Sequence, residues 1–343
     1  FLDEAASELK ANAVFDIYGV LSTHAWGVPE GAEEDAASPE SSETNLVGIP
    51  NFHVLHYSKV DAVPKGLPPP PSMSDAMGRL RELLEQCVGD QTAAIYLLAN
   101  FISTTYSRAT EHPICAFPLN VAGCRSQSSP AAAEGIREIM EILLPKVKYL
   151  PLSSSSLSDR PFHSLKDFSK STQLQMGEFQ LSDGTHLVID ETTTPTDKFA
   201  VHGYAEDNLR TLDKVIGEQR IDYDFGCYRL TFDVDVPVLV LSEGRSRFVA
   251  TPFRVVLPHG PSPTADPLKA VDEKELAVLR AAILHARAAL RDVTISGEVA
   301  KAIQDDFVSM AASPVSAMTP DAKASHLSQL LIVCRYVACD LLK

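Results

Sequence analysis

The sequence predicts an α/β protein built around a largely parallel sheet. Between residues 117 and 257, short apolar runs of strand length alternate with amphipathic segments of helix length. This alternation favours parallel strands that are joined by helices. After residue 272 every patterned segment has helical spacing, so a helical C-terminal region is expected to follow the sheet.

The composition bounds the class of protein. The chain has 343 residues, of which 45% are hydrophobic and 22% are charged, as in a globular protein of two or three domains. Its net charge of −15 disfavours a main role in binding nucleic acid, which requires Lys and Arg to neutralise phosphates. No apolar run reaches the roughly 18 residues of a membrane span. Because the chain begins at Phe1 without an initiator Met, we expect a fragment of a longer protein.

The six cysteines form no C-x-x-C pair and have no regular spacing. A zinc site or a disulfide framework would require such spacing. We therefore expect reduced, buried thiols in a protein of the nucleus or cytosol.

A small β region is expected over residues 1–62. Residues 9–22 alternate as a strand does, with Gly19 as a kink, and residues 52–57 form a second strand. The region could be the tail of a barrel that begins upstream. Residues 30–44 between the strands are rich in Glu, Asp, Ala, Ser and Pro, and predict an acidic disordered loop.

A Pro-rich linker over residues 63–74 then leads into the α/β core, residues 75–260. Within that core, helical spacing predicts helices at residues 77–88, 91–107, 136–144 and 205–217. Apolar runs predict strands at residues 117–123, 147–152, 186–191, 237–242 and 253–257. Residues 220–225 and 228–234 flank Gly226-Cys227 and predict a β-hairpin with a two-residue turn.

The C-terminal region, residues 266–343, is predicted to be helical. One long helix covers residues 272–291, and Ser296 caps the next. Thr319 caps the last helix and Pro320 takes its first position. The residues of that last helix expected to face the core are Leu327, Leu330, Leu331, Cys334, Val337, Ala338 and Leu341.

The run from His186 to Glu191 has the layout of a Walker B element, in which an Asp holds magnesium and a Glu activates water. A working ATPase also needs G-x-x-x-x-G-K-[S/T], whose lysine reaches the phosphates. The dipeptide Gly-Lys occurs nowhere in the chain. Half of the signature without the other half indicates a fold that was kept after its chemistry was lost. The alternative is a core strand that runs into a solvated acidic turn.

Two loops are further candidate sites. Gly123–Ser129 lies between a strand and a helix, where backbone amides can cradle phosphate, but it has one glycine and no lysine, and Arg125 cannot simply replace that lysine. An ordinary strand–helix turn is the alternative. Ser242–Arg247 carries Arg245 and Arg247, which could contact a phosphate or an acidic partner, or could be scattered surface arginines.

Metal binding is not expected. His53 and His56 sit three apart on a strand and should face opposite sides of it. Four aspartates near the hairpin could offer carboxylates to a cation, but charges that protect sheet edges explain them as well. These are Asp222, Asp224, Asp233 and Asp235.

Several segments, in this order along the chain, resemble the MCM-binding protein family, which associates with the minichromosome maintenance (MCM) replicative helicase. The match is carried by their order and spacing, and it covers residue 9 to the C-terminus. The segments are Leu9–Ser22, Leu119–Cys124, Leu187–Thr192, Ile221–Phe225, Leu241–Ser246 and Ile303–Val308.

The resemblance implies a degenerate AAA+-like three-layer module with a C-terminal helical lid, preceded by a small OB-like β segment. It makes Gly123 and Arg125 remnants of Walker A, and Asp190 and Glu191 remnants of Walker B. Ser242 falls where helicase subunits place a sensor-1 Asn. Helicase activity is not expected from this chain, because the sensor-1 Asn and the Walker A lysine are both missing from it.

The function that the resemblance implies is non-enzymatic binding of MCM helicase subunits, without a cofactor. It further implies roles in MCM complex assembly and stability, in unloading from chromatin and in sister-chromatid cohesion during DNA replication, in the nucleus or also the cytoplasm. Two alternatives stay open. One is a weak nucleotide-binding enzyme that uses Asp190 and Glu191, and the other is an acidic interaction scaffold.

Overall fold

The computed structural model forms two compact units, residues 13–61 and residues 1–12 with 62–343. The predicted acidic loop, Arg125 and Thr319 lie outside the residues that the structure describes. The described residues are 11–22, 51–60, 66–105, 107–108, 113, 116–124, 131–166, 174–192, 202–258, 267–312 and 320–338.

The smaller unit contains an antiparallel ribbon of two strands, β1 (Phe15–Ser22) and β2 (Asn51–Lys59). The register between them shifts at Tyr18/Gly19, which is the irregularity of a β-bulge. The predicted pair of strands and the kink at Gly19 are therefore confirmed.

The bulge corrects the prediction for the two histidines of β2. His56 pairs with Tyr18 and His53 pairs with Val20. Tyr18 and Val20 are two apart on β1 and share a face, so His53 and His56 share that face too. The prediction of opposite faces was wrong because it assumed a strand without a bulge. Within the described part of the chain, no cluster of three His, Cys, Asp or Glu side chains could hold a metal ion.

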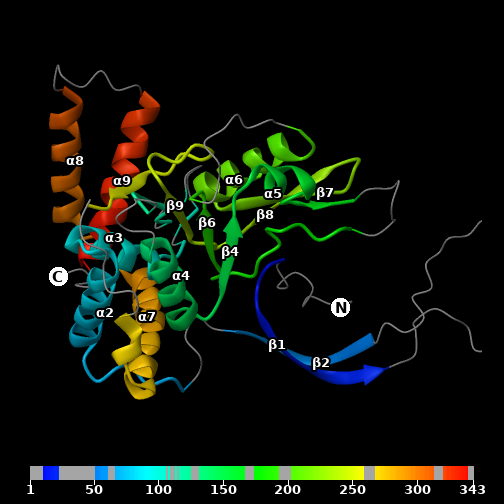
Figure 1. The fold of residues 1–343 in the computed structure, drawn as a ribbon, viewed down its shortest axis with the longest axis horizontal. Coiled ribbons are helices and arrows are strands. Elements are labelled where there is room, and N and C mark those ends of the chain that lie inside the picture. The colour runs from blue at the N-terminus through cyan, green and yellow to red at the C-terminus, as the bar shows by residue number, and fades with distance from the viewer. Residues whose placement is uncertain are drawn as a thin grey trace, which may run out of the picture. The chain divides into compact units, whose positions relative to one another are not determined.

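The larger unit is organised around a five-stranded sheet of order β10-β3-β9-β6-β4, in which every pair is parallel (Figure 1). This confirms the predicted parallel α/β sheet. Its strands are β3 (Leu119–Ala122), β4 (Val147–Pro151), β6 (His186–Asp190), β9 (Val238–Ser242) and β10 (Phe253–Val256).

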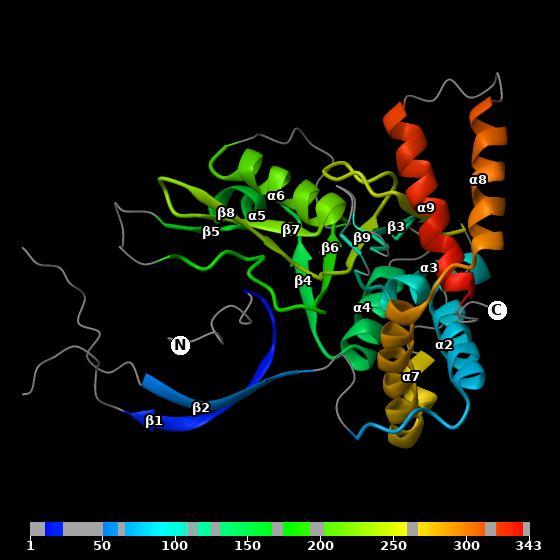
Figure 2. The ribbon, with the colours of Figure 1, turned by 180° about the vertical axis from the view of Figure 1, so that it is seen from behind.

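Both faces of the sheet are covered, because alternate residues of each central strand point to opposite sides. Val188 and Leu239 belong to one apolar cluster, with helices α2 (Met73–Val88), α3 (Gln91–Phe101), α4 (Ala131–Leu143) and α7 (Glu273–Asp292). Leu187 and Val240 belong to a second cluster, with helices α5 (Ser154–Asp159) and α6 (Ala205–Glu218). Figures 1 and 2 show these helices on the two sides of the sheet.

Helix α3 ends at Phe101 and not at Ser107, as the apolar run had predicted. The residues that follow make hydrogen bonds outside the helix. Ser103 Oγ accepts from Phe117 N at 3.0 Å, and Thr104 Oγ1 donates to Asp235 Oδ2 at 2.8 Å. These bonds lie between segments far apart in the sequence, so helical spacing could not reveal them.

A second, three-stranded sheet has the order β5-β7-β8, with β5 (Ser164–Leu165), β7 (Arg220–Asp224) and β8 (Arg229–Asp233). Strands β7 and β8 form the predicted antiparallel hairpin. Phe225 N donates to Tyr228 O at 2.9 Å, and Gly226 takes a φ of 82°, which favours glycine in a tight hairpin turn. Strand β5 and helix α5 were not predicted, since both are short and serine-rich.

The predicted cap at Ser296 is confirmed, because Ser296 Oγ accepts from Val299 N at 3.4 Å at the start of α8 (Gly297–Ala312). The long helix α7 begins at Glu273 and not at Asp272, whose side chain accepts from Glu275 N and caps it. Helix α9 (Pro320–Ala338) buries Ile332 and Tyr336 in the core, whereas the predicted core residues Leu327, Leu330, Leu331 and Cys334 are only partly buried. In the described residues no helix is long and apolar enough to cross a membrane.

A pH dependence is expected from His186, at the start of β6. Its side chain is fully buried, Nε2 lies 3.3 Å from Asn100 O, and Nδ1 has no hydrogen-bond partner among the described residues. Burial, together with the nearby Arg287 guanidinium, lowers the pKa of His186 to about 3.

Because the unfolded chain protonates this imidazole near pH 6.5 and the folded protein does not, stability should fall as pH drops below about 6.5. The slope from this one group is about 1.4 kcal/mol per pH unit. Melting temperatures between pH 7 and pH 5 should therefore fall more steeply for the wild type than for His186→Gln, which cannot titrate. Equal slopes would contradict the assignment.

Candidate functional site

The candidate site lies where three adjacent parallel strands end. Strand β9 is hydrogen-bonded to β3 on one side and to β6 on the other. Parallel strands bring their carboxyl ends to one edge of a sheet, which is where open α/β folds bind ligands. This edge brings together Gly123 after β3, Asp190-Glu191 at the end of β6, and Ser242 at the end of β9.

The glycine turn is bonded to the neighbouring strand. Gly123 has a φ of 88°, and its N–H donates to Glu243 O at 3.1 Å. Cys124 N donates to Ser242 O at 3.1 Å. A phosphate-binding loop needs its amides free to face the ligand. The two amides described here are already used by the end of β9.

Both oxygens of the Asp190 carboxylate accept hydrogen bonds from the protein. Oδ1 accepts from Thr192 N at 2.8 Å and from Thr192 Oγ1 at 2.6 Å, while Oδ2 accepts from the Tyr149 hydroxyl. Burial and the bond to Asp190 raise the pKa of the Tyr149 hydroxyl well above its ordinary value, so it remains a donor. The position that would hold magnesium in an ATPase therefore connects β6 to β4.

Glu191 is bonded to the loop that follows β9. It is 7% exposed, its Oε1 accepts from Ser246 Oγ at 2.6 Å, and its Oε2 accepts from Arg247 N at 3.0 Å. Burial raises the pKa of Glu191 above its ordinary value, and these hydrogen bonds oppose the rise. The carboxylate that would activate water in an ATPase therefore fixes a loop.

Ser242 is buried at the position where the resemblance places a sensor residue. Its Oγ lies 2.9 Å from Asn120 Oδ1 and 2.7 Å from Gly244 O. The hydroxyl therefore orders the end of β9.

Arg245 and Arg247 are exposed, and within the described part of the chain neither forms an ion pair. They line a pocket of about 290 Å³ together with Glu191, Ser242, Glu243 and Gly244. Both guanidiniums thus lie at the same edge of the sheet as the Glu191 carboxylate.

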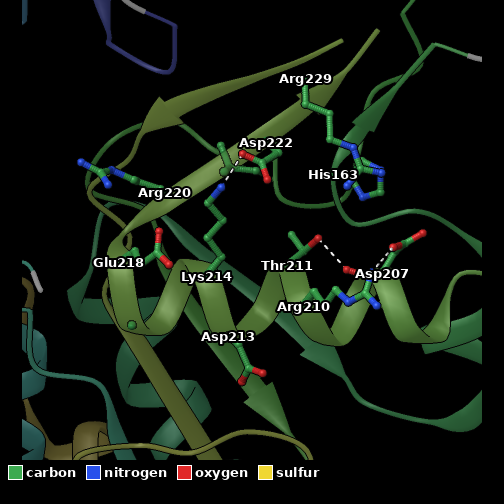
Figure 3. A pocket seen from close by; sticks show the side chains of 12 residues that line it. His163, Asp207, Arg210, Thr211, Asp213, Lys214, Glu218, Arg220, Asp222 and Arg229 are labelled. Atoms are coloured by element: carbon green, nitrogen blue, oxygen red, sulfur yellow. Dashed lines mark hydrogen bonds and ion pairs between the residues drawn. The ribbon is translucent and has the colours of Figure 1, made fainter. Parts of the chain in front are cut away.

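A larger pocket, of about 490 Å³, lies between α6 and the β7–β8 hairpin. Figure 3 shows Lys214 reaching from α6 to Asp222 on β7, and their atoms are 2.6 Å apart. Arg229 pairs with Asp224 at 2.8 Å. The charges that line this pocket therefore largely neutralise one another, and it carries no argument for an ionic ligand.

The four aspartates considered as cation ligands are bonded to groups of the protein. Asp222 and Asp224 make the pairs just described, and Asp233 lies 3.2 Å from Arg220 Nε. Asp235 accepts from Thr104 Oγ1 and Thr105 N, each at 2.8 Å. Their carboxylates therefore form hydrogen bonds and ion pairs within the hairpin and with the segments next to it.

The thiols are partly as expected. Cys87 and Cys124 are free and buried, and burial raises the pKa of each to about 12. Cys227, at the hairpin turn, is exposed, which the expectation of buried thiols did not foresee. A hairpin tip has few neighbours, so the local position outweighs the usual burial of cysteine.

Sequence reasoning missed Tyr149, Thr192 and Ser246, which bond to the two carboxylates. Tyr149 and Ser246 lie 41 and 55 positions from their partners, so no local pattern marks them. The bond from Thr192 N could have been found, because an Asp side chain commonly accepts from the backbone N–H two residues further on.

The fold and this site define a class: a mixed α/β protein with a five-stranded parallel sheet, at whose carboxyl edge the described polar groups hydrogen-bond to one another. The sequence profile of the family described as "Mini-chromosome maintenance replisome factor" matches residues 2–341, and the chain belongs to this family.

Relatives named "Mini-chromosome maintenance complex-binding protein" are similar to most of the chain. The bovine protein is 28% identical over 368 residues, covering 96% of this chain and 55% of the relative. The human protein is 27% identical over 365 residues, covering 95% and 55%. The Drosophila melanogaster protein is 34% identical over 266 residues, covering 75% and 42%. The chain thus spans about half the length of the curated relatives it matches.

Proposed function

We propose that this chain is a non-enzymatic binding partner of MCM helicase subunits. Family membership and the names of the relatives support the partner. The observation that carries the non-enzymatic part is the site itself. The Asp190 and Glu191 carboxylates accept hydrogen bonds from the protein, and the amides of Gly123 and Cys124 donate to the end of β9.

The proposal includes a degenerate AAA+-like core at residues 75–260 and a helical lid at residues 266–343. The parallel sheet, and the meeting of the Walker-like and sensor-like positions at one edge of it, support the core. Residues 1–62 would be a small OB-like β segment, joined through the linker at residues 63–74. The ribbon of β1 and β2 fits such a segment.

The proposed mechanism is mimicry of a helicase subunit. An AAA+-shaped module would present a subunit-like face and occupy the place of another subunit. This action would serve MCM complex assembly and stability, unloading from chromatin and sister-chromatid cohesion, in the nucleus or also in the cytoplasm. The edge that carries Arg245 and Arg247 is the proposed contact, since ring ATPases meet their neighbours at the site end of a subunit, often through arginines.

Two alternatives differ in what they would bind. A weak nucleotide-binding enzyme would need free carboxylates at Asp190 and Glu191, and both are hydrogen-bonded. An acidic scaffold would not need a specific contact surface such as the sheet edge that carries Arg245 and Arg247. Pulldown of MCM subunits from nuclear extract tests the proposal against the scaffold, and calorimetric titration with ATP tests it against the enzyme.

No ATP hydrolysis above background is expected from the purified protein, because the phosphate-binding lysine is missing and the Glu191 carboxylate bonds to Ser246 and Arg247. Phosphate release measured with ATP and magnesium should be the same for the wild type and for Glu191→Gln. Turnover that disappears in Glu191→Gln would establish a working Walker B glutamate and overturn this part of the account.

A further inference from the structure

We infer that Glu191 is a positioning residue which holds a partner-binding arginine loop, residues 243–249, in the conformation that an acidic surface of an MCM subunit recognises. The inference rests on the proposed function and adds to it the residue that shapes the contact and the chemistry of what is contacted.

The arginine loop has no regular secondary structure, yet its backbone is fixed at several points. Glu191 accepts from Ser246 Oγ and Arg247 N, and Ser246 Oγ in turn accepts from Val249 N at 3.2 Å. Val249 is itself buried in the second apolar cluster. The carboxylate therefore connects the middle of the loop to the end of β6.

The backbone of the arginine loop is hydrogen-bonded to Glu191, but its two guanidiniums are exposed to solvent. Arg245 and Arg247 are exposed, whereas Ser246 between them is half-buried and turned toward Glu191. The Arg247 amide is thus bonded to Glu191, while its guanidinium has no ion pair among the residues that the structure describes. Holding the loop before binding reduces the entropy that a partner must remove when it docks.

The charge of the loop indicates a carboxylate-bearing partner. Arg presents a planar fork of donors that matches a carboxylate bidentately. Neither guanidinium has an ion pair among the described residues, so each can bind a single carboxylate. Glu243 and Glu191 line the same pocket, so its lining carries as many acidic as basic side chains and has no excess positive charge for a polyanionic nucleotide phosphate. The occupant to which we commit is therefore an Asp- or Glu-bearing surface of an MCM subunit.

The test compares two substitutions of Glu191. Glu191→Gln can keep the loop in place, because its carbonyl oxygen can accept from Arg247 N while its amide donates to the Ser246 hydroxyl, which can act as an acceptor. Glu191→Ala removes both bonds. We expect binding of purified MCM subunits to the 343-residue chain to weaken at least tenfold in Glu191→Ala and to stay within about threefold of the wild type in Glu191→Gln. Glu85→Ala, at an exposed position of α2, is the matched control.

Hydrogen exchange of the free protein provides a second readout. The Arg247 amide should exchange faster in Glu191→Ala and at the wild-type rate in Glu191→Gln, while the exchange of β6 and β9 stays unchanged. Should Glu191→Ala fail to fold, Ser246→Ala removes one of the two bonds without removing the buried carboxylate, and its binding should fall between the two other variants.

Four outcomes decide the inference. It holds if Glu191→Ala weakens the binding of MCM subunits and Glu191→Gln retains it. It fails if Glu191→Ala binds like the wild type, or if Gln is as weak as Ala while the exchange of the loop is normal. It also fails if millimolar ATP with magnesium displaces the MCM subunit, because the loop would then be a phosphate site. If the wild type binds no MCM subunit at all, the proposed function fails instead.

Discussion

Replacing Arg245 and Arg247 together by glutamate is expected to weaken the binding of MCM subunits by about 2–5 kcal/mol, which is a 30-fold loss or more. The physical reason is the removal of two donors and the repulsion that follows when like charges are forced together at a contact. The loss would be this large only if the contacts are desolvated, and it would be small if they lie on the rim of the interface.

The same double substitution should leave the fold almost unchanged. Both side chains are exposed, and exposed charges contribute under about 1 kcal/mol to stability. Titration calorimetry would measure the affinity, and thermal unfolding would measure the stability. Arg254→Glu with Lys274→Glu is a matched control, because it changes the net charge equally at two exposed positions outside the loop. Unchanged binding with an intact fold would remove this edge as the interface, and the helices after Asp272 would be tested next.

A large loss of stability is expected from Asn208→Ala in helix α6. The Asn208 side chain is fully buried and bonds only to backbone groups. Its Nδ2 donates to Leu157 O and to Arg160 O, each at 2.7 Å, and its Oδ1 accepts from Phe162 N at 2.7 Å. The substitution leaves three backbone groups without partners, which costs about 3–9 kcal/mol at roughly 1–3 kcal/mol for each buried group.

Urea unfolding would measure this loss. Gln304→Ala is the control, since Gln304 is an exposed amide on α8 whose removal should change the free energy of unfolding by less than about 0.5 kcal/mol. If Asn208→Ala costs less than about 1 kcal/mol, the Asn208 bonds do not hold the segment between α5 and β5.

Those parts of the fold that depend on local pattern could be predicted from the sequence. The runs at β6 and β9 are apolar on both faces, as buried parallel strands must be, and they predicted the sheet correctly. Helix α5 was missed because its residues Ser154–Asp159 carry a cap but almost no apolar periodicity. The end of α3 was placed too late because Thr104 bonds to Asp235, 131 positions away.

The positions of the candidate site residues could be predicted from the sequence, but their hydrogen bonds could not. The sequence located Asp190 and Glu191 at the end of a strand, and it located Arg245 and Arg247 after another. It could not reveal that Glu191 bonds to Ser246, because that bond depends on β6 and β9 being neighbours in the sheet. The hydrogen bonds of Glu191 are therefore a tertiary feature that local sequence pattern does not encode.

Direct binding of the purified chain to individually purified MCM subunits tests the central claim. The account predicts a saturable complex with at least one subunit, with the same affinity in the presence and absence of ATP and magnesium. It also predicts that the affinity falls with rising salt, because charged contacts are screened. No complex with any subunit, in the presence or absence of nucleotide, would contradict the account.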